Sequence, residues 1–574
     1  MRLVVPYLGN LNREDARLLR LAEFMGCRCE LLRLEEGVAL SPKFIETHVA
    51  DKDACFVVNP KVIRESLSSD SFPHDLSSYL TSQFAFVLVH NLAPVPLTAR
   101  IMSALSEGTL HSVHRLETSG LSYEIDSAHN QVCGAFSGLT FGPVNATNDQ
   151  VIAGNPSAGT VRTHIAIGGQ PFFASVPRER AEVFFLAGVE TADLDARWGE
   201  KPLTEYFSQL VPPAMFLRYA FRDECWRPHQ HHATLIIDDP LLRKDYGSLN
   251  YERVLGLMDE YNFHTSIAFI PHNYQRNSKS TIRMFRERPD RFSICFHGND
   301  HTAAELATKD VRLLNSMLTV AEERMDAHLK STGIPCDKVM VFPQGNFSVD
   351  AMKILRAHNF AAAVNSGPYP TGEHVGLTLA EMIEPAILNY GAFPLFVRHY
   401  IREITPQHVA LNLLFGKPTL IVEHHDVFKN PECLTQLVSR INALAPNIKW
   451  SNLQTAVENS YLCRWAPDGT FQVRAYSNAG KIENSSDALL RCSVTWSRPT
   501  ESIVQEVFVD GMPWPDARTD RGIRFFFELS PASSRAFSLV HENDFGSSDA
   551  NRRFQWKAKA FLRRRLSEIR DTYT

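Results

Sequence analysis

Two histidines four residues apart follow an apolar stretch of the chain. His297 and His301 enclose a Gly, an Asn and an Asp in the sequence HGNDH. An earlier apolar stretch, ATLII, ends in two adjacent carboxylates, Asp238 and Asp239. Two imidazoles and one carboxylate are a common ligand set for a catalytic Zn²⁺ or similar ion, with one position left for water or substrate. These residues therefore predict a metal site.

The second carboxylate of the pair has a chemical use of its own. Side chains alternate along a strand, but a loop begins at Asp238 and Asp239, so both can face the same site. One can then bind a metal while the other accepts a proton from water, whose pKa a bound metal lowers toward about 7. The pair favours hydrolytic chemistry.

These residues lie where strand and helix patterns alternate along the chain. Between residues 229 and 460, continuously apolar strands are separated by amphipathic helical stretches. This pattern predicts a parallel barrel or closed sheet of about seven β/α units. Polar residues recur where strands give way to loops, and the carboxyl ends of barrel strands form the active-site face.

The rest of the chain predicts a multidomain α/β protein. We expect a doubly wound βαβ domain without a phosphate-binding fingerprint at 1–110 and a β-rich domain at 111–228. Short alternating strands predict a β-sandwich at 461–548, and residues 549–574 predict a basic helical tail.

The motifs TLIIDD and HGNDH resemble those of the NodB-homology polysaccharide deacetylases, which are similar to carbohydrate esterase family 4. The resemblance covers residues 230 to 460 and implies a distorted (β/α)7 barrel. It also implies that Asp238 is the catalytic base and that Asp239, His297 and His301 bind a divalent metal. Zn²⁺ is the expected ion, with Co²⁺, Ni²⁺ and Fe²⁺ as alternatives.

The third motif of that family departs from its pattern here. Its R-x-P-Y/F segment is VFPQG in this chain, so Val341 replaces the arginine and Gln344 the aromatic residue. The main-chain N–H of Gln344 could still stabilise an oxyanion, because that role needs only a backbone donor. Arg398, at the end of FPLFVR, is our candidate replacement for orienting Asp238. The alternative for Arg398 is a structural salt bridge.

The last motif of the family, an apolar strand ending in histidine, resembles LIVEHHD. The resemblance implies a general acid that protonates the leaving amine, and both His424 and His425 fit it. Asp426 could orient that histidine. The groove motif D-x-x-x-W has no convincing counterpart, so the substrate cleft is expected to differ from that of typical members. The histidines of HQHH at 229–232 are expected at the opposite end of their strand.

Composition and charge limit the partners of the protein. Hydrophobic residues make up 44% of the chain, charged residues 21%, and the formal net charge is −5. Nucleic acid is therefore not an expected partner. The start lacks the pattern of a secretory signal and no apolar run is long enough to span a membrane, so we expect a cytoplasmic protein. Ten scattered cysteines predict free thiols.

The function that these residues favour is removal of N-acetyl or another acyl group from an amino-sugar oligosaccharide or glycan precursor. The basic tail could contact an anionic membrane surface. One alternative is another C–N or glycosidic hydrolase on the same barrel, because a fold does not determine a substrate. Another is a catalytically silent carbohydrate-binding or scaffold protein. The sequence leaves the oligomeric state open.

Overall fold

The computed structural model describes residues 1–35, 38–49, 53–66, 72–116, 120–145, 147–155, 160–373, 375–497, 504–519 and 522–541. The chain forms two compact units. The first comprises Met1–Trp226 and Thr378–Ala380, and the second begins at Arg227 and contains the rest of the chain. The expected basic tail at 549–574 lies outside the described residues.

The first unit is built on a nine-stranded sheet that is parallel in one half and antiparallel in the other. In sheet order the strands are β2 (Cys29–Leu34), β1 (Arg2–Leu8), β3 (Ala54–Val58), β4 (Phe86–Val89), β11 (Glu182–Leu186), β10 (Gln170–Pro177), β9 (Arg162–Ile167), β6 (Tyr123–Ile125) and β7 (Thr140–Phe141). Strands β5 (Leu110–Arg115) and β8 (Gln150–Gly154) form a separate pair.

The expected division at residue 110 runs through this sheet. Strand β11 lies beside β4 in parallel, with Val183 opposite Val87. Without β11, the parallel half would end in a row of unpaired backbone groups on β4. The two segments are far apart in the sequence, so the local apolar pattern predicts both strands without showing that they pair. The segments 1–110 and 111–228 therefore share one sheet within one compact unit.

Helices complete the first unit, and α1 shows how they are set. The side chain of Asn12 caps α1 by accepting from the backbone N–H groups of Glu14 and Asp15, and Leu18 and Leu21 are buried. A capped N-terminus and an apolar face are what such a helix needs to pack on a sheet. The helices are α1 (Arg13–Phe24), α2 (Pro42–His48), α3 (Pro60–Ser66), α4 (His74–Gln83), α5 (Pro96–Leu105), α6 (Asn130–Cys133) and α7 (Phe207–Phe221).

The second unit contains a parallel, nearly closed barrel-like sheet. Four of its strands are almost entirely buried, as the continuous apolar pattern predicts. In sheet order they are β20 (Leu395–Val397), β19 (Ala362–Asn365), β18 (Cys336–Val341), β17 (Phe292–His297), β16 (Thr265–Phe269), β13 (His232–Asp238), β22 (Thr419–Glu423) and β21 (His399–Tyr400), with β23 (Lys449–Trp450) paired to β13. This is one strand more along the path than the expected seven units.

The two ends of this path are consecutive segments of the chain. Strand β20 pairs with β19, strand β21 pairs with β22, and Arg398 is the single residue between β20 and β21. The backbone N–H of Arg398 donates to the carbonyl of Asn365 at 2.9 Å. One stretch of extended chain therefore joins both edges of the sheet. The apolar pattern of FPLFVRHY predicts a single strand, but the stretch is divided between β20 and β21.

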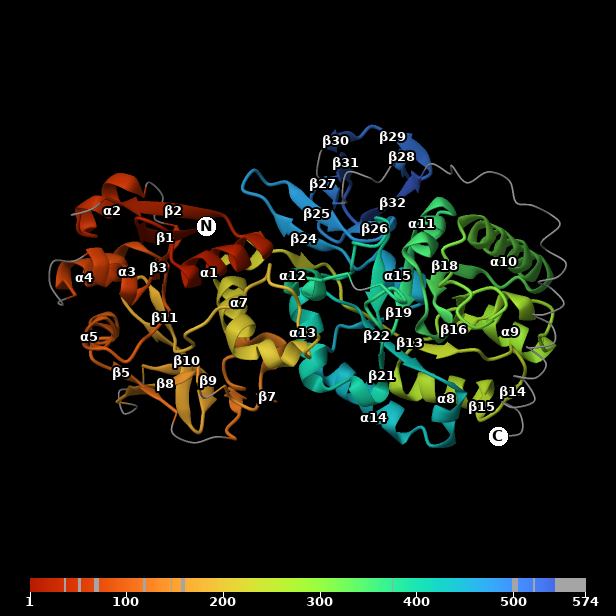
Figure 1. Ribbon diagram of the computed structural model, residues 1–574, viewed down its shortest axis with the longest axis horizontal. Helices are drawn as coiled ribbons and strands as arrows, with labels where there is room; N and C mark the ends of the chain where they lie inside the picture. The colour runs from red at the N-terminus through yellow and green to blue at the C-terminus, as the bar shows by residue number, and fades with distance from the viewer. Residues whose placement is uncertain are drawn as a thin grey trace. The chain divides into compact units, whose positions relative to one another are not determined.

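Helices surround the barrel strands (Figure 1). They are α8 (Tyr251–Tyr261), α9 (Lys279–Glu287), α10 (Val311–Thr332), α11 (Val349–Ala357), α13 (Pro406–Phe415), α14 (Glu432–Leu444) and α15 (Leu453–Glu458). Short helix α12 (Leu379–Ile383) and the hairpin of β14 (Asp245–Tyr246) and β15 (Leu249–Asn250) complete the connections. Several begin at side-chain caps, such as Ser348 for α11 and Asp310 for α10.

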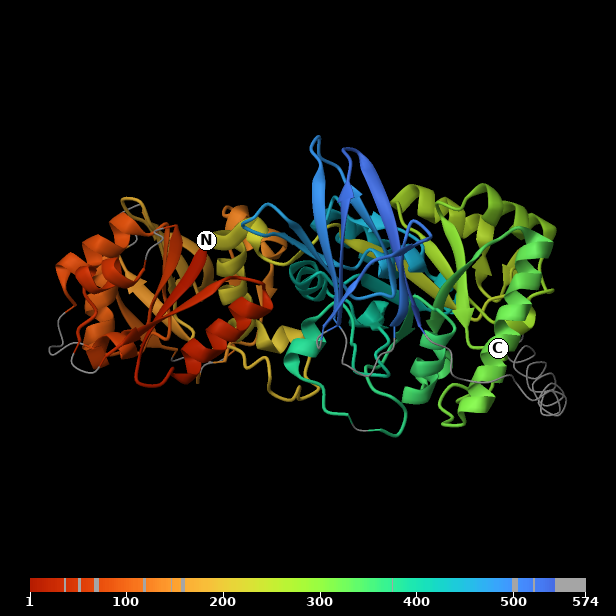
Figure 2. The same ribbon diagram turned by 90° about the horizontal axis from the view of Figure 1, so that it is seen from above.

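Two sheets near the end of the second unit enclose one core, and their long strands stand together in Figure 2. Strand β31 shows the alternation, because Phe525 and Phe527 are buried while Phe526 is exposed. One sheet contains β12 (Arg227–Pro228), β24 (Leu462–Trp465), β25 (Phe471–Ala475), β27 (Leu490–Ser497), β31 (Gly522–Leu529) and β30 (Ala517–Thr519). The other contains β26 (Ala479–Asn484), β32 (Ser533–His541), β28 (Val504–Val509) and β29 (Met512–Trp514).

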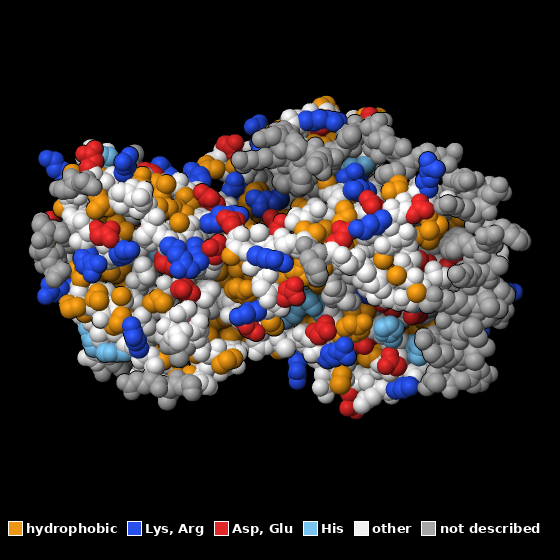
Figure 3. Space-filling model, viewed as in Figure 1, with side chains coloured by type: hydrophobic (Ala, Val, Ile, Leu, Met, Phe, Trp, Pro, Cys, Tyr) orange, Lys and Arg blue, Asp and Glu red, His pale blue; other side chains and the backbone are white. Residues whose placement is uncertain are grey.

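Two surface properties bear on the expected partners. Among the helices of the described residues, none has both the length and the hydrophobicity needed to cross a bilayer. On the face shown in Figure 3, the basic and acidic side chains of the described residues are interspersed. The expected location in the cytoplasm and the contact of the tail with a membrane stay predictions.

Candidate metal and catalytic site

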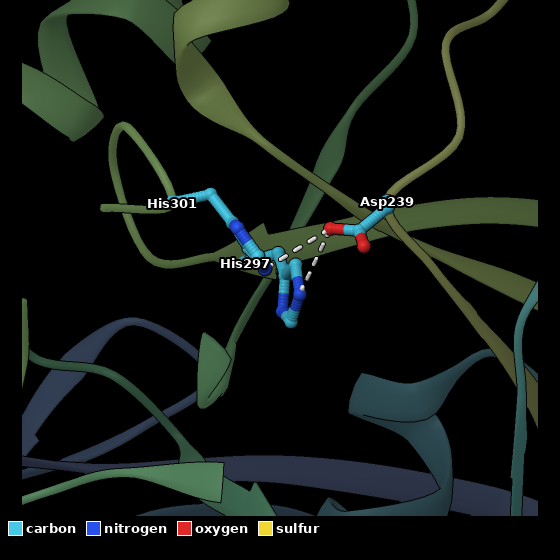
Figure 4. A group of neighbouring side chains, drawn as sticks. All are labelled: Asp239, His297 and His301. Atoms are coloured by element: carbon cyan, nitrogen blue, oxygen red, sulfur yellow. Dashed lines mark ion pairs between the residues drawn. The ribbon is translucent and has the colours of Figure 1, made fainter. Parts of the chain in front are cut away.

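Asp239, His297 and His301 converge at the carboxyl ends of two barrel strands. The Oδ1 atom of Asp239 lies 3.4 Å from Nε2 of His297 and 3.2 Å from Nε2 of His301. One ligand atom from each residue lies within 4.8 Å of the others. Figure 4 shows the carboxylate facing both rings. The three residues predicted to bind a metal therefore form one group.

The backbone at Asp239 explains how two adjacent carboxylates face one site. Asp239 has a φ of 80°, in the left-handed region that residues other than glycine rarely adopt. Its N–H donates to the carbonyl of Ala268 at 3.2 Å, which holds the turn in place. The turn breaks the alternation of the strand, so Asp238 and Asp239 line the same cavity. Such backbone conformations concentrate at functional sites.

The tautomer of His297 suits a metal ligand. Its Nδ1 lies 3.0 Å from the carbonyl oxygen of Val341, which can only accept, so Nδ1 carries the hydrogen. In the neutral ring, Nε2 then presents a lone pair toward Asp239. Burial favours the neutral ring, but Asp238 and Asp239 outweigh it and raise the pKa of His297 above its usual value. Two imidazole nitrogens and a carboxylate that attract positive charge fit a divalent cation.

A buried carboxylate holds the loop that carries His301. Glu305 is 7% exposed, and its carboxylate accepts from the backbone N–H groups of residues 299, 300, 301 and 302 at 2.8–3.2 Å. The loop leaves no room for a larger residue at Gly298, where φ is 62° and an added Cβ would lie 2.0 Å from Oε1 of Glu305. Burial raises the pKa of Glu305 above its usual value.

The spacing of Thr302 and Glu305 predicts a helix directly after His301, but no helix forms there and this prediction is wrong. Thr302 and Glu305 fit the sequence pattern of a capping box, and the Glu305 carboxylate does accept from the N–H of Thr302 at 3.2 Å. It also binds the preceding N–H groups, so the segment stays a turn. The helix, α10, begins at Val311 with Asp310 as its cap.

Ion pairs of Asp300 also hold the histidine loop. Asp300 is 2% exposed, and its Oδ1 lies 2.7 Å from Nη1 of Arg324 and 3.0 Å from Nδ1 of His272. Arg324 also donates to Oδ1 of Asn299 at 2.6 Å. Burial alone would raise the pKa of Asp300, but His272 and Arg324 outweigh it and lower that pKa. The central residues of HGNDH are therefore fixed to α10.

Arg398 forms a two-pronged ion pair with Asp238. Its Nη1 and Nη2 lie 2.6 Å and 2.7 Å from the two carboxylate oxygens, and both side chains are almost fully buried. Burial alone would raise the pKa of Asp238, but Arg398 and His297 outweigh it and hold that pKa below its usual value. Asp238 is therefore ionised at neutral pH in a fixed orientation. Val341, at the position of the family arginine, instead supplies the carbonyl that receives His297.

All the residues predicted for the site line one cavity of about 390 Å³. They are Asp238, Asp239, His297, His301, Gln344, Arg398, His424 and His425. Gln344 has a φ of 57° at the turn after β18. His424 and His425 both reach the cavity, so the structure leaves the choice between them open. Asp426 is exposed.

His425 packs against the β14–β15 hairpin. The ring of Tyr246 meets it edge-on at 5.2 Å between centroids. Gly247 lies against the same ring, because a Cβ at Gly247 would be 2.4 Å from Nδ1 of His425. The β14–β15 hairpin therefore holds His425 in place at the wall of the cavity.

The position of Tyr246 after a strand end predicts either a sugar-site residue or a residue of a solvated loop, and Tyr246 lines the cavity. Three further residues line it without having been predicted: Gly345, Ser366 and Tyr400. The sequence held a signal for two of them. Tyr400 lies two residues after Arg398, the spacing at which extended chain repeats a face. Ser366 directly follows β19, as the metal-binding residues follow their strands. The histidines at 229 and 231 line a different hollow with Asn447 and Lys449, at the start of β13.

Comparison with known proteins gives matches to structures alone. No family model matches the sequence, and no curated protein matches it. Among solved structures, the chain is similar to Agd3, described as a novel carbohydrate deacetylase. The TM-score is 0.50 with 10% identity, over 94% of this chain and 99% of that chain. The chain resembles the carbohydrate deacetylases. At this identity the similarity shows a shared fold.

Shorter matches are similar to part of the chain. A family 4 carbohydrate esterase from Streptomyces lividans, in complex with acetate, matches at 11% identity and a TM-score of 0.24, covering 39% of this chain and 92% of its own. A family 4 acetyl xylan esterase from Clostridium thermocellum, in complex with a cobalt ion, matches at 16% identity and a TM-score of 0.23, covering 38% of this chain and 87% of its own.

Proposed function

We propose that the protein is a metal-dependent hydrolase that removes an N-acetyl or other acyl group from an amino sugar. The observation that carries the proposal is the meeting of two groups in one cavity. Asp239, His297 and His301 present their ligand atoms within 4.8 Å of one another, and the ion-paired Asp238 lines the same cavity. A ligand set beside an ionised carboxylate is the arrangement that hydrolysis of an acyl group needs.

The metal would be held by Asp239, His297 and His301. Zn²⁺ suits this set, with Co²⁺, Ni²⁺ and Fe²⁺ as alternatives. When bound, it would supply Lewis-acid polarisation of the acyl carbonyl and a lowered pKa for water. Glu305 and the pair of Asp300 with Arg324 keep the histidine loop in the shape that this binding requires.

Asp238 is the proposed base. Its carboxylate stays ionised at neutral pH because Arg398 holds its pKa low, and it accepts the proton of the attacking water. Arg398 binds both carboxylate oxygens, which fixes the direction of the lone pairs that remain. Arg398 would thereby orient Asp238, which is the role that the resemblance assigns to an arginine at position 341.

The remaining steps need an oxyanion donor and an acid. The main-chain N–H of Gln344 is proposed to donate to the oxyanion of the tetrahedral intermediate. His424 or His425 is proposed to give a proton to the leaving nitrogen, which converts it from a poor leaving group into an amine. The same residues would act on an acyl ester, so the amide substrate rests on the resemblance to the deacetylases.

The proposal is tested by metal analysis and acetate release together. Purified protein, protein treated with a chelator, and protein restored with Zn²⁺ are assayed on N-acetylglucosamine oligomers. We expect one metal per chain and acetate release that follows the metal. Asp239→Ala should lose both, whereas Asp326→Asn, an exposed carboxylate on α10, should change neither.

The other outcomes separate the alternatives. Metal binding without acetate release, but with cleavage of another C–N or glycosidic bond, would favour a different hydrolase on the same barrel. Tight oligosaccharide binding without turnover, whether or not metal is present, would favour a carbohydrate-binding or scaffold protein. Absence of metal even after reconstitution would overturn the proposal.

A further inference from the structure

Two cysteines far apart in the sequence meet in the first unit. The sulfur atoms of Cys27 and Cys225 lie 3.3 Å apart, although the residues are 198 positions apart in the chain. Cys27 is 6% exposed and Cys225 is fully buried. Cys27 lies two residues before the start of β2. Cys225 follows α7 and immediately precedes Trp226, where the first segment of this unit ends.

The backbones on both sides of the sulfur pair are held together by other contacts. The N–H of Trp226 donates to the carbonyl of Met25 at 2.7 Å. Arg28 forms an ion pair with Glu224 at 3.1 Å, and the terminal amine of Met1 lies 2.8 Å from the same carboxylate. The two chain segments are therefore adjacent before any covalent link exists, and a disulfide of about 2.05 Å needs a sulfur movement of only about 1 Å.

We propose that Cys27 and Cys225 form a disulfide bond when the chain folds in the presence of a low-molecular-weight disulfide such as oxidised glutathione. One thiol, as its thiolate, attacks the small disulfide and releases one small thiolate. The second cysteine, after losing its proton, displaces the other small thiol and closes the bond. The two cysteines lose two electrons and two protons, and the small disulfide becomes two thiols.

The folded state restrains this exchange. Burial, together with the neighbouring Cys225, raises the pKa of the Cys27 thiol well above its usual value. Because the thiolate is the attacking species, a folded protein with reduced cysteines exchanges slowly. The bond therefore forms while the unit folds, and once formed it is protected from small thiols by the same burial.

Cys29 is the neighbouring thiol that this pairing must exclude. It lies on β2, and its Sγ lies 3.8 Å from the carbonyl oxygen of Cys27, not on the sulfur of Cys225. The spacing of Cys27 and Cys29 is unsuited to a bond between them, and the sequence gives no sign that Cys225 is near either one. The expectation of free thiols rested on sequence spacing and on the expected reducing cytoplasm, and neither reveals this pair.

The bond would close a loop that spans almost the whole of the first unit. Cross-linking residues so far apart removes much of the freedom of the unfolded chain. We expect the oxidised protein to melt about 5–10 °C above the reduced protein, in the transition that belongs to the first unit. A native bond would also indicate that the protein works in an oxidising compartment, contrary to the expected cytoplasm.

Peptide mapping of the full chain tests the pairing. The protein is refolded with reduced and oxidised glutathione, its free thiols are blocked with N-ethylmaleimide under denaturing conditions, and it is digested with trypsin without reduction. Cleavage after Arg28 separates Cys27 from Cys29. We expect a linked pair of the peptides 21–28 and 223–243, lighter by two hydrogens than the separate peptides, which disappears after reduction.

Variants distinguish the pair from its neighbours. Cys27→Ala and Cys225→Ala should abolish the linked peptide and the difference in melting temperature between oxidised and reduced protein. Cys29→Ala should keep both. Blocking of both Cys27 and Cys225 in the wild-type protein after oxidative refolding would overturn the proposal, and so would a linked peptide that contains Cys29. All of these readings are independent of acetate release.

Discussion

Both units bring an aspartate and a histidine together beside the carboxyl ends of parallel strands, with different results. In the first unit, Oδ1 of Asp15 lies 2.7 Å from Nε2 of His90 and 3.0 Å from Nδ2 of Asn59. In the barrel, Oδ1 of Asp239 lies 3.4 Å from His297 and 3.2 Å from His301. Both clusters pair a carboxylate with an imidazole, but Asp15 comes from the first turn of α1, whereas Asp239 directly follows β13.

The difference lies in what the carboxylate meets. Asp15 is fully buried and is surrounded by hydrogen-bond donors, because the amide of Asn59 and the ring of His90 both give hydrogens to it. Asp239 faces nitrogens that can present lone pairs, and it borders a cavity of about 390 Å³. A carboxylate whose oxygens are hydrogen-bonded to buried donors stabilises a fold. Acceptor atoms that converge beside a cavity are suited to binding a cation. We therefore assign a structural role to the first cluster.

The largest expected effect separates chemistry from metal binding within the barrel. Asp238→Asn removes the proposed base but keeps one acceptor oxygen for Arg398, so acetate release should fall about 10²–10⁴-fold in kcat. Metal content should stay at the wild-type level, because Asp238 is not among the grouped ligands. Steady-state kinetics and elemental analysis of the same sample measure both. Loss of the metal together with the activity would instead make Asp238 a ligand.

The matching change in the first unit should act on stability alone. Asp15→Ala leaves the buried donors of His90 and Asn59 without their acceptor, which costs about 3–5 kcal/mol for a buried pair. Denaturant unfolding of the full chain, with hydrogen exchange to locate the loss, measures it. The metal content of the folded protein should be unchanged. A catalytic defect in fully folded Asp15→Ala would remove the distinction between the two clusters.

A smaller effect is expected from the residue behind the histidine loop. Glu305→Gln retains the size of the side chain but replaces one carboxylate oxygen by a donor, which faces backbone N–H groups. Metal affinity should fall about 10–100-fold, the usual range for a residue that supports a ligand. Competition with a chromogenic chelator measures it. Glu323→Gln on α10 is the matched control and should bind metal as the wild type does.

The smallest effect concerns pH and the first cluster. Burial alone would raise the pKa of Asp15, but His90, Asn59 and Asn12 outweigh it and lower that pKa. The ionised carboxylate therefore contributes stability at a pH above its unfolded value of about 3.9, and this stability is lost as the pH falls through the folded value. Urea unfolding from pH 6 to pH 3 should show the advantage of wild type over Asp15→Asn shrinking below about pH 4. A constant difference would contradict this assignment.

The sequence predicted the barrel strands and the metal-binding and base residues at their ends because both depend on local patterns. Strand ends follow from apolar runs, and Asp238, Asp239, His297 and His301 stand at those ends. The carboxyl ends of parallel strands meet at one edge, so a one-dimensional pattern gives a three-dimensional neighbourhood. Arg398 was proposed as the replacement for the family arginine that is missing at Val341, and its guanidinium binds Asp238. The catalytic roles of these residues stay predictions.

The features that the sequence did not predict depend on long-range contacts or on competition for one group. The pairing of β4 with β11 joins segments whose local patterns carry no partner information. Glu305 fits the pattern of a helix start. Several backbone N–H groups compete for its carboxylate, however, and those of the preceding loop residues bind it. The adjacent His424 and His425 both reach the cavity, so neither position nor alternation selects one of them.

The seam of the barrel joins the construction of the sheet to the orientation of the proposed base. Arg398 stands between β20 and β21, at the point where the chain passes from one edge of the sheet to the other, and its guanidinium binds Asp238 on β13. Insertion of even one residue at this point would shift the register of one edge and displace the guanidinium at the same time. The seam is therefore constrained twice: its length is constrained by the register of the sheet, and the residue at position 398 by the carboxylate that it orients.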